Sequence, residues 1–338
     1  MDNPAHRHHP ESTIQPALAK APGKVILFGE HAVVYGRPAI AVPVTDVCAT
    51  ATVESGEPGS GVTIIAADLP TAGSLSGQHY RLRDAPADDA LKASIELALD
   101  AFSPGPIAAG HGPEPDLFIT VSSTIPIARG LGSGAAVATA VMRAIARYFG
   151  RVAQADEVSR LVYEVEKLHH GTPSGIDNTV IAYEQPVYFV RGQGMTRLSA
   201  GTPLHLVIAD TGIVSSTRAV VSDVRRRWEA ESERYEGLFD EIGAIARLAR
   251  SAIEGGDSAA IARLMNENHQ LLMDLGVSAP ELDNLVQVAR MAGAMGAKMS
   301  GAGWGGNMLA LVEPQHAPTV ARALEQAGAI RTITSRVS

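Results

Sequence analysis

The chain has 338 residues, of which 46% are hydrophobic and 19% charged, so it is long enough for two domains with their own cores and is not intrinsically disordered. Aromatic residues make up only 4%, and the formal net charge is -8 with no basic block, which argues against binding to nucleic acid or to a membrane surface. A single cysteine, Cys48, excludes an internal disulfide framework and predicts a cytoplasmic protein.

The first residues are expected to form a disordered tail. Residues 1–16 are polar and place His6, His8 and His9 beside prolines. Such a histidine cluster can bind a metal ion, but a tail without fixed structure is the simpler interpretation. The tail lacks the apolar core of a signal peptide, and no later run is long enough to span a membrane.

A short run with the character of a buried strand, residues 25–28, lies between charged side chains. Lys24 precedes it, Glu30 and His31 follow it, and a glycine stands at each end. Charged groups beside a buried strand need partners. The cluster is therefore either a functional site or an internal network of ion pairs.

The next part of the chain points to structure and not to chemistry. Residues 38–44 and 47–53 predict strands, and the second alternates as a half-buried strand does, with Cys48 as a core thiol. Residues 88–102 predict a helix. Clusters of glycine and proline mark loops around that helix at residues 55–61, 70–77 and 104–115.

A glycine-rich stretch then joins a predicted strand, residues 117–121, to a predicted helix that runs to about Tyr148. Three glycines within five residues, Gly130, Gly132 and Gly134, let the backbone approach a ligand closely. A helix N-terminus also offers unpaired N–H groups and the positive end of the helix dipole, so a phosphate would bind here. A glycine-rich turn that binds nothing fits the same pattern.

Two acidic residues follow. Residues 156–168 carry an apolar stripe at helical spacing, and Glu166 lies at its edge, where its carboxylate can point inward or stay exposed beside Lys167. A proline and a glycine then end the helix. Asp177 comes next in a short polar turn, and a lone aspartate in a turn is usually a cap.

The rest of the chain predicts a second structural unit. Residues 301–306, late in this unit, match the pattern G-x-G-x-x-G. This stretch follows a predicted helix and precedes an apolar strand, whereas a dinucleotide-binding turn follows a strand and precedes a helix. We interpret these glycines as a backbone wall against a ligand or another part of the protein. Residues 191–203 mark the candidate boundary, and the predicted elements after it are strands at 204–209 and 330–334 and helices at 220–253, 258–275, 280–295 and 318–326.

Three separated motifs coincide: the Lys/Glu/His strand, the Gly-Leu-Gly-Ser loop before a helix, and the late Ser-Gly-Ala-Gly-x-Gly-Gly turn. Together they resemble the GHMP kinase superfamily, whose phosphate loop is not of the Walker type, and the sequence has no G-x-x-x-x-G-K-[ST]. Within it the chain is most similar to the mevalonate kinase family, over about residues 17–312. The matching segments are Ala21-Pro22-Gly23-Lys24-Val25-Ile26-Leu27, Gly29-Glu30-His31-Ala32-Val33-Val34, His170-Gly171-Thr172-Pro173-Ser174-Gly175-Ile176-Asp177-Asn178 and Leu275-Gly276-Val277-Ser278.

The resemblance implies an α+β fold of two lobes with the active site in the cleft between them. After the tail at 1–16, residues 17–200 would form the ATP-binding lobe, similar to the second domain of ribosomal protein S5. Residues 201–338 would form a ferredoxin-like lobe. The sequence leaves open whether the protein is a monomer or a homodimer.

The resemblance also implies a role for each matching residue in ATP-dependent phosphorylation of mevalonate. Asp177 would receive the proton of the substrate hydroxyl, and Lys24 would pair with Asp177 and contact the transferring phosphoryl group. Glu166 would bind Mg²⁺, which accompanies ATP. The remaining implied residues are Glu30, His31, Thr217 and Ala302 on the substrate side and Gly130, Leu131, Gly132, Ser133, Gly134, Ala135 and Ala136 around the ATP phosphates.

One departure from the family pattern concerns the metal. The family commonly has two serines after Gly-Leu-Gly, and the second is associated with the metal, but here Gly134 occupies that position. Either Ser133 supplies the hydroxyl ligand or water replaces it. Thr172 also stands where an asparagine is frequent.

Three alternatives to mevalonate phosphorylation remain open from the sequence. The first is kinase activity on another small alcohol, such as phosphomevalonate, homoserine or a sugar. The second is ATP-dependent decarboxylation of a phosphorylated mevalonate on the same fold. The third is a ligand-binding protein without catalysis, against which the presence of both Lys24 and Asp177 argues.

Overall fold

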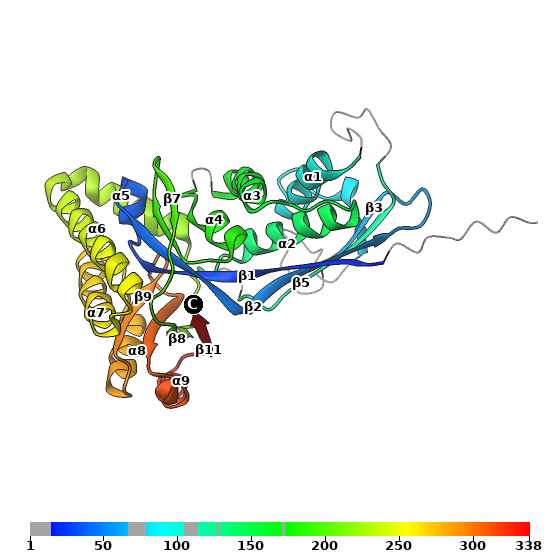
Figure 1. The fold of residues 1–338 in the computed structure, drawn as a ribbon. Helices are drawn as coiled ribbons and strands as arrows, with labels where there is room; N and C mark the ends of the chain where they lie inside the picture. The colour runs from blue at the N-terminus through cyan, green and yellow to red at the C-terminus, as the bar shows by residue number, and fades with distance from the viewer. Residues whose placement is uncertain (1–14, 67–78, 105–113, 127–128, 171–172) are drawn as a thin grey trace, which may run out of the picture.

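The computed structural model describes residues 15–66, 79–104, 114–126, 129–170 and 173–338. This part of the chain forms two β-sheets with helices packed against them (Figure 1). The predicted α+β class is therefore correct. The histidines of the tail and the loop predicted at 70–77 lie outside the described residues, as does most of the loop predicted at 104–115.

The first sheet has seven strands, with the order β4-β3-β5-β2-β6-β7 and β1 paired to β2. All pairs are antiparallel except β3 with β5. Its centre is one long strand, β2, whose two halves were predicted as separate strands. In the structure they are continuous, and a register shift at Pro22/Gly23 of β1 marks the point where the two predicted strands meet. The strands are β1 Ala17–Phe28, β2 Ala39–Ser55, β3 Val62–Ala66, β4 His79–Arg81, β5 Leu117–Ser123, β6 Val187–Val190 and β7 Gly194–Arg197.

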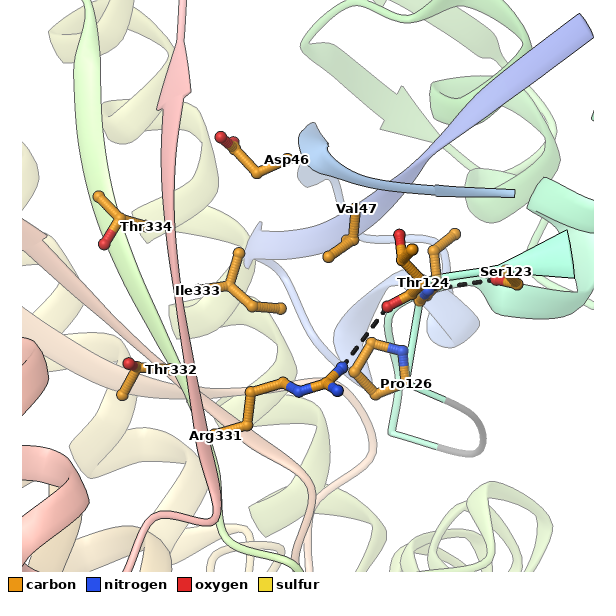
Figure 2. Close-up of a pocket in the computed structure, with 10 residues that line it drawn as sticks. Asp46, Val47, Ser123, Thr124, Pro126, Arg331, Thr332, Ile333 and Thr334 are labelled. Carbon is orange, nitrogen blue, oxygen red and sulfur yellow. Dashed lines mark hydrogen bonds between the residues drawn. The ribbon is translucent and has the colours of Figure 1, made fainter. Parts of the chain in front are cut away.

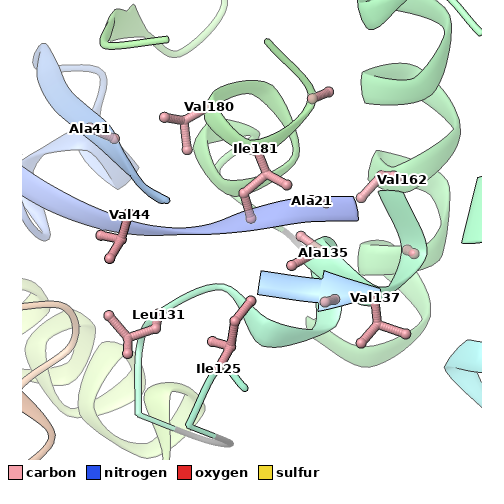
Figure 3. Close-up of a cluster of buried hydrophobic side chains, with 14 of the residues drawn as sticks. Ala21, Ala41, Val44, Ile125, Leu131, Ala135, Val137, Val162, Val180 and Ile181 are labelled. Carbon is pink, nitrogen blue, oxygen red and sulfur yellow. The ribbon is translucent and has the colours of Figure 1, made fainter. Parts of the chain in front are cut away.

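Four helices lie together on one side of this sheet (Figure 1). The central one, α2, packs on β1 and β2 through a face of small residues, which lets the helix lie close to the strands. Figure 3 shows Ala135 of this helix beside Ile181 of α4 and Ala21 of β1. The helices are α1 Ala90–Phe102, α2 Ser133–Tyr148, α3 Ala155–His170 and α4 Ile176–Tyr183.

The second sheet is antiparallel with the order β11-β8-β10-β9. Helices follow β8 and β10, so the chain runs strand, helices, two strands, helix, strand, which is the ferredoxin-like arrangement. The strands are β8 Leu204–Asp210, β9 Gly296–Ser300, β10 Asn307–Val312 and β11 Arg331–Val337, and the helices are α5 Thr217–Ala230, α6 Ser232–Gly255, α7 Ser258–Asp274, α8 Pro280–Met291 and α9 Ala317–Gln326. Short 3₁₀ helices are η1 Ala32–Tyr35, η2 Leu82–Asp84 and η4 Pro314–His316.

Both faces of the second sheet are covered. Along β8, Val207 and Ala209 belong to the core under α8 and α9, whereas Leu206 and Ile208 belong to the core that includes the first sheet. Successive side chains of a strand point to opposite faces, so β8 contributes to both cores at once. The second sheet is therefore fixed against the first, and the residues at its ends keep a defined position relative to the glycine loop.

Two other structural findings bear on function. Cys48, expected in the core, is a free thiol of intermediate exposure, because it lies at the register shift between β1 and β2. No helix among the described residues is long and apolar enough to cross a membrane.

Candidate active site

The glycine loop leads from β5 into α2 as predicted. Gly130 and Gly132 adopt left-handed backbone conformations, with φ of 77° and 72°. Gly132 is the N-cap of α2, and no side chain caps this helix. The first N–H groups of α2 and the positive end of its dipole are thus left for an anion, as a phosphate-binding loop requires.

Lys24 and Asp177, far apart in sequence, form an ion pair in the structure. The Lys24 Nζ atom lies 2.9 Å from Asp177 Oδ1, and the side chains are 5% and 28% exposed. Asp177, predicted in a short polar turn, stands in the first turn of the helix α4, which begins after Gly175 with φ of 89°. The pair therefore has a buried ammonium and a carboxylate that faces open space.

This ion pair lies directly beside the glycine loop. The backbone N–H of Lys24 donates to the Leu131 carbonyl at 3.0 Å. A Cβ atom on Gly132 would lie 2.9 Å from Lys24 Cγ and 2.8 Å from Ile181 Cδ1, so only glycine allows this approach. The ammonium, the carboxylate and the uncapped start of α2 consequently share one site.

Glu166 of α3 points toward the same site. Burial and the nearby Asp177 carboxylate raise the pKa of Glu166 to about 7, against the opposite influence of Lys24. Its Oε1 lies 3.9 Å from where a Cβ of Gly134 would stand. Lys167, its neighbour in sequence, pairs with Glu164 instead. Of the two orientations that the sequence left open for Glu166, the structure shows the inward one.

The site fits a magnesium ion that arrives with phosphates better than a permanent metal site. Among the described residues, no group of three or more His, Cys, Asp or Glu side chains could hold a metal ion. Mg²⁺ with a nucleotide usually needs only one or two carboxylates beside the phosphates. Glu166 is a partly buried carboxylate with a raised pKa, and the Ser133 hydroxyl has no hydrogen-bond partner within the described ranges. Both would accommodate such a cation.

Glu30 and His31 join the end of β1 to the second sheet. Glu30 is fully buried, is bonded by the Lys298 ammonium and accepts from Asn268 Nδ2 at 3.2 Å. His31 Nε2–H donates to the Ala302 carbonyl at 2.8 Å, and burial lowers the pKa of His31 to about 4, so its ring is neutral at pH 7. The sequence allowed either a functional site or an internal network of ion pairs here. Glu30 belongs to an internal ion network, whereas His31 contacts the late glycine turn.

The glycine turn at 301–306 connects β9 to β10 and packs tightly on its surroundings. It follows a strand, not the predicted helix, so it is a hairpin connection and no dinucleotide-binding turn. A Cβ on Gly303 would lie 1.9 Å from the Val277 carbonyl oxygen. The Ser215 hydroxyl donates to the Gly303 carbonyl at 2.6 Å. Thr217, at the start of α5, is exposed, and among the described residues no hydrogen bond or ion pair joins it to Lys24 or Asp177.

A separate groove of about 560 Å³ lies between the middle of β2, the end of β5 and the first residues of β11. Figure 2 shows Arg331 reaching from β11 to the Thr124 carbonyl, at 3.5 Å, with Asp46 and Thr334 farther along the groove. Neither Lys24, Asp177 nor Glu166 lines it. It is therefore distinct from the site at the glycine loop.

Comparison with known proteins gives consistent matches. Residues 92–185 match the family described as GHMP kinases N terminal domain, and residues 249–330 match GHMP kinases C terminal. A mevalonate kinase of Pyrococcus horikoshii is 37% identical over 334 residues, 95% of each chain.

The chain belongs to the GHMP kinase family, in its mevalonate kinase branch.

Solved structures agree with this assignment. The L. major mevalonate kinase in complex with R-mevalonate has a TM-score of 0.81 at 28% identity and covers 95% of each chain. The Methanococcus jannaschii mevalonate kinase has a TM-score of 0.79 at 25% identity, with 95% of this chain and 98% of that one covered. The protein is thus an ATP-dependent kinase with the GHMP fold.

Sequence reasoning did not predict two ion pairs around this site. Lys298 of β9 is fully buried and neutralises Glu30, and Asp210 at the end of β8 pairs with Arg129. The rule that pointed to Lys24, a charged side chain beside a buried strand, applies to both. Their partners, however, come from distant parts of the chain, which no local pattern reveals.

Proposed function

We propose that the protein transfers the γ-phosphoryl group of ATP to the 5-hydroxyl group of mevalonate. The observation that carries this proposal is the Lys24–Asp177 ion pair, 2.9 Å long, beside the uncapped N-terminus of α2. An alcohol that approaches Asp177 would meet a phosphate bound at the loop. The names of the relatives support mevalonate as that alcohol.

In this mechanism the protein positions the reactants and neutralises charge. Backbone N–H groups of residues 130–136 hold the ATP phosphates. Asp177 accepts a hydrogen bond from the substrate hydroxyl and takes its proton as the phosphoryl group moves. Lys24 pairs with Asp177 and stabilises negative charge on the oxygens of the transferring group. The methylene groups of Lys24 pack against Gly132, and this contact fixes the position of the Lys24 ammonium.

Glu166 and the Ser133 hydroxyl would hold the Mg²⁺ that accompanies ATP. The ion supplies neutralisation of phosphate charge when it is bound. Glu166 must be ionised to bind it, and its pKa of about 7 falls once a cation is present. The absence of a second loop serine is compensated here, we infer, by Ser133 alone, since Gly134 has no side chain.

The substrate would lie between Asp177 and the late glycine turn. His31 holds the Ala302 carbonyl, so we assign both to the wall of the mevalonate pocket, and we place Thr217 at its outer edge. Glu30, buried under Lys298, supports this wall without touching substrate. We also retain the division into lobes 17–200 and 201–338 and a cytoplasmic location as parts of the proposal.

The test is an ADP-release assay of the purified protein with ATP, Mg²⁺ and a panel of alcohols. We expect turnover with mevalonate and little with homoserine, galactose or phosphomevalonate. Turnover with another alcohol alone would refute the substrate assignment. Release of carbon dioxide from a phosphorylated mevalonate would instead reveal a decarboxylase.

A further inference from the structure

The residue before the glycine loop, Arg129, connects this loop to the second sheet. Its Nε atom lies 3.4 Å from Asp210 Oδ2 at the end of β8. Its backbone carbonyl accepts a hydrogen bond from the Asn307 side-chain amide at the start of β10. Both the side chain and the main chain of Arg129 are thus held by the second sheet.

Asp210 and Asn307 are placed together by strand pairing. They are register partners in the β8–β10 ladder, and Asn307 also pairs with Ser300, the last residue before the glycine turn. Asp210 is itself fixed, because its Oδ1 accepts from the Gly212 N–H at 2.8 Å. The two side chains that hold Arg129, those of Asp210 and Asn307, therefore lie side by side at one end of the second sheet.

The two glycine segments meet at the same place. A Cβ built on Gly130 would lie 4.0 Å from the Cα of Gly301, and one built on Gly306 would lie 3.6 Å from the Arg129 carbonyl oxygen. The phosphate loop and the turn at 301–306 are thus neighbours whose spacing depends on Arg129.

The Arg129–Asp210 pair is well shielded from water. Their side chains are only 15% and 6% exposed. Arg129 Nη1 is buried without a hydrogen-bond partner among the described residues. Shielded ion pairs contribute little net stability, since desolvation offsets the attraction, whereas they do fix geometry. The pair is better suited to setting the position of the loop than to stabilising the fold.

We propose that Arg129 is a positioning residue for phosphoryl transfer, and that its contacts with Asp210 and Asn307 hold the phosphate loop in register with the Lys24–Asp177 pair. This inference rests on the proposed function of the loop in binding ATP phosphates. On the other side, Lys24 fixes the loop through its N–H bond to the Leu131 carbonyl. Loss of the Arg129 contacts would leave the Lys24–Leu131 hydrogen bond in place and allow a small displacement of the phosphate loop.

The inference is tested with Arg129→Ala and Asp210→Asn, each compared with the parent protein. The readouts are the Kd for Mg-ATP by calorimetry, the KM for each substrate, kcat and the thermal midpoint. We expect the Kd and KM for ATP to rise about tenfold, while the KM for mevalonate changes less than about twofold. The reason is that a small displacement of the loop weakens its contacts with the ATP phosphates and leaves the contacts with mevalonate unchanged. Arg129→Lys should recover part of the ATP affinity.

The matched control is Arg37→Ala. Arg37, between η1 and β2, also contacts a distant helix, through ion pairs with Glu236 and with Asp240 of α6, the latter at 2.9 Å. Among the described residues it has no hydrogen bond or ion pair with either glycine segment. We expect this variant to keep the KM for ATP within about twofold, since surface pairs contribute little. An equal rise in the KM for ATP in the control would overturn the inference.

The double variant Arg129→Ala/Asp210→Asn separates a shared role from two independent ones. If the pair acts as a unit, the double variant binds ATP about as weakly as either single variant. Additive losses, or an unchanged KM for ATP in Arg129→Ala, would refute the positioning role. If the parent protein neither binds ATP nor phosphorylates any alcohol, the proposed function fails instead, and the two failures are thereby distinguished.

Discussion

Asp177 combines an ionic partner with access to solvent, as a group that must meet a substrate requires. The Lys24 ammonium lies 2.9 Å from Asp177 Oδ1, and the Asp177 side chain remains 28% exposed. Replacement of Asp177 by Asn keeps the shape of the side chain but removes the charge and the proton acceptor. We expect Asp177→Asn to lower kcat about 10³-fold, within the usual range for a lost general base.

The same variant should bind ATP with nearly the affinity of the parent, because Asp177 does not belong to the phosphate loop. ADP release and calorimetric ATP binding measure the two effects. Glu267→Gln serves as the control, since Glu267 is an exposed carboxylate whose ion-pair partner among the described residues is Arg263. If Asp177→Asn retains more than about a tenth of the parental kcat, Asp177 has no role as proton acceptor.

Glu166 is expected to lower the stability of the metal-free protein at neutral and higher pH. Its pKa is raised from 4.5 to about 7, first by burial and then by Asp177. Between these values the folded protein holds a proton that the unfolded chain releases, so stability falls as the pH rises from 4.5 through 7. Glu166→Gln removes this penalty.

We therefore expect Glu166→Gln to raise the free energy of unfolding at pH 8 by on the order of 2 kcal/mol and to leave it unchanged at pH 4. Thermal midpoints in the presence of EDTA, measured across this pH range, check the prediction. The variant should also lose most of its activity, because a neutral amide binds Mg²⁺ poorly. A lower midpoint than the parent at pH 8 would contradict this view of Glu166.

At the scale of single residues, the sequence supplied the chemistry but not the partners. The meeting of Lys24 with Asp177 followed from the family resemblance and not from any spacing. Glu166 was ambiguous because helical periodicity places it at the edge of a stripe, and only the packing of α3 decides its direction. The roles of these residues in catalysis stay predictions.

At the scale of secondary-structure elements, hydrophobic periodicity predicted most helices, and the errors have local causes. The helix predicted at 220–253 is two helices, α5 and α6, because Glu231 leaves the helical region with φ of −133° and ψ of 54°. The helix predicted at 280–295 ends at Met291, and Gly296 begins β9. The short strands β3 and β4 escaped prediction because glycine- and proline-rich stretches surround them.

The glycine loop offers a pair of substitutions that distinguish its two helix-start glycines. Gly132 has φ of 72° and no room for a Cβ beside Lys24 and Ile181. Gly134 lies within α2, where only Glu166 Oε1 comes within 4 Å of an added Cβ, at 3.9 Å. The first position requires glycine, whereas the second does not.

We expect Gly132→Ala to destabilise the protein by about 1–3 kcal/mol, through backbone strain and displacement of Lys24, and to reduce kcat. Gly134→Ser should fold at least as well as the parent, because glycine is a poor helix former. It should also lower the Mg²⁺ concentration needed for half-maximal rate, since its hydroxyl would stand near Glu166. Thermal midpoints and Mg²⁺ titrations measure these effects. Equal tolerance of both substitutions would refute this account of the loop.

At the scale of the whole molecule, the two sheets are joined by polar contacts that cross long stretches of sequence. Ser300 donates to the Ile26 carbonyl at 2.9 Å, His31 bonds Ala302, and Lys298 bonds Glu30. The family resemblance predicted that two lobes exist and that these segments matter. It could not predict which side chains pair, because such contacts depend on the final arrangement of both sheets.

The buried pair of Glu30 and Lys298 provides the test at this scale. Both side chains have 0% exposure, and burial lowers the pKa of Lys298 while Glu30 opposes that shift. Lys298→Met would leave the Glu30 carboxylate buried with Asn268 as its one remaining side-chain partner in the part of the chain that the structure describes. Loss of one member of a buried pair typically costs about 3–5 kcal/mol, which lowers the thermal midpoint by on the order of 10 °C in a chain of this size.

The cause of that loss can be separated from loss of packing by pH and by a second substitution. An unpaired buried carboxylate can be protonated, so the defect of Lys298→Met should shrink as the pH falls from 8 to 5. Glu30→Gln/Lys298→Met, which removes both charges, should recover most of the midpoint. The exposed Arg263 pairs with Glu267 on the surface of α7, so Arg263→Met should change the midpoint little. A defect of the same size at both pH values, or a double variant as unstable as Lys298→Met, would show that the lost methylene packing and not the unpaired charge is responsible.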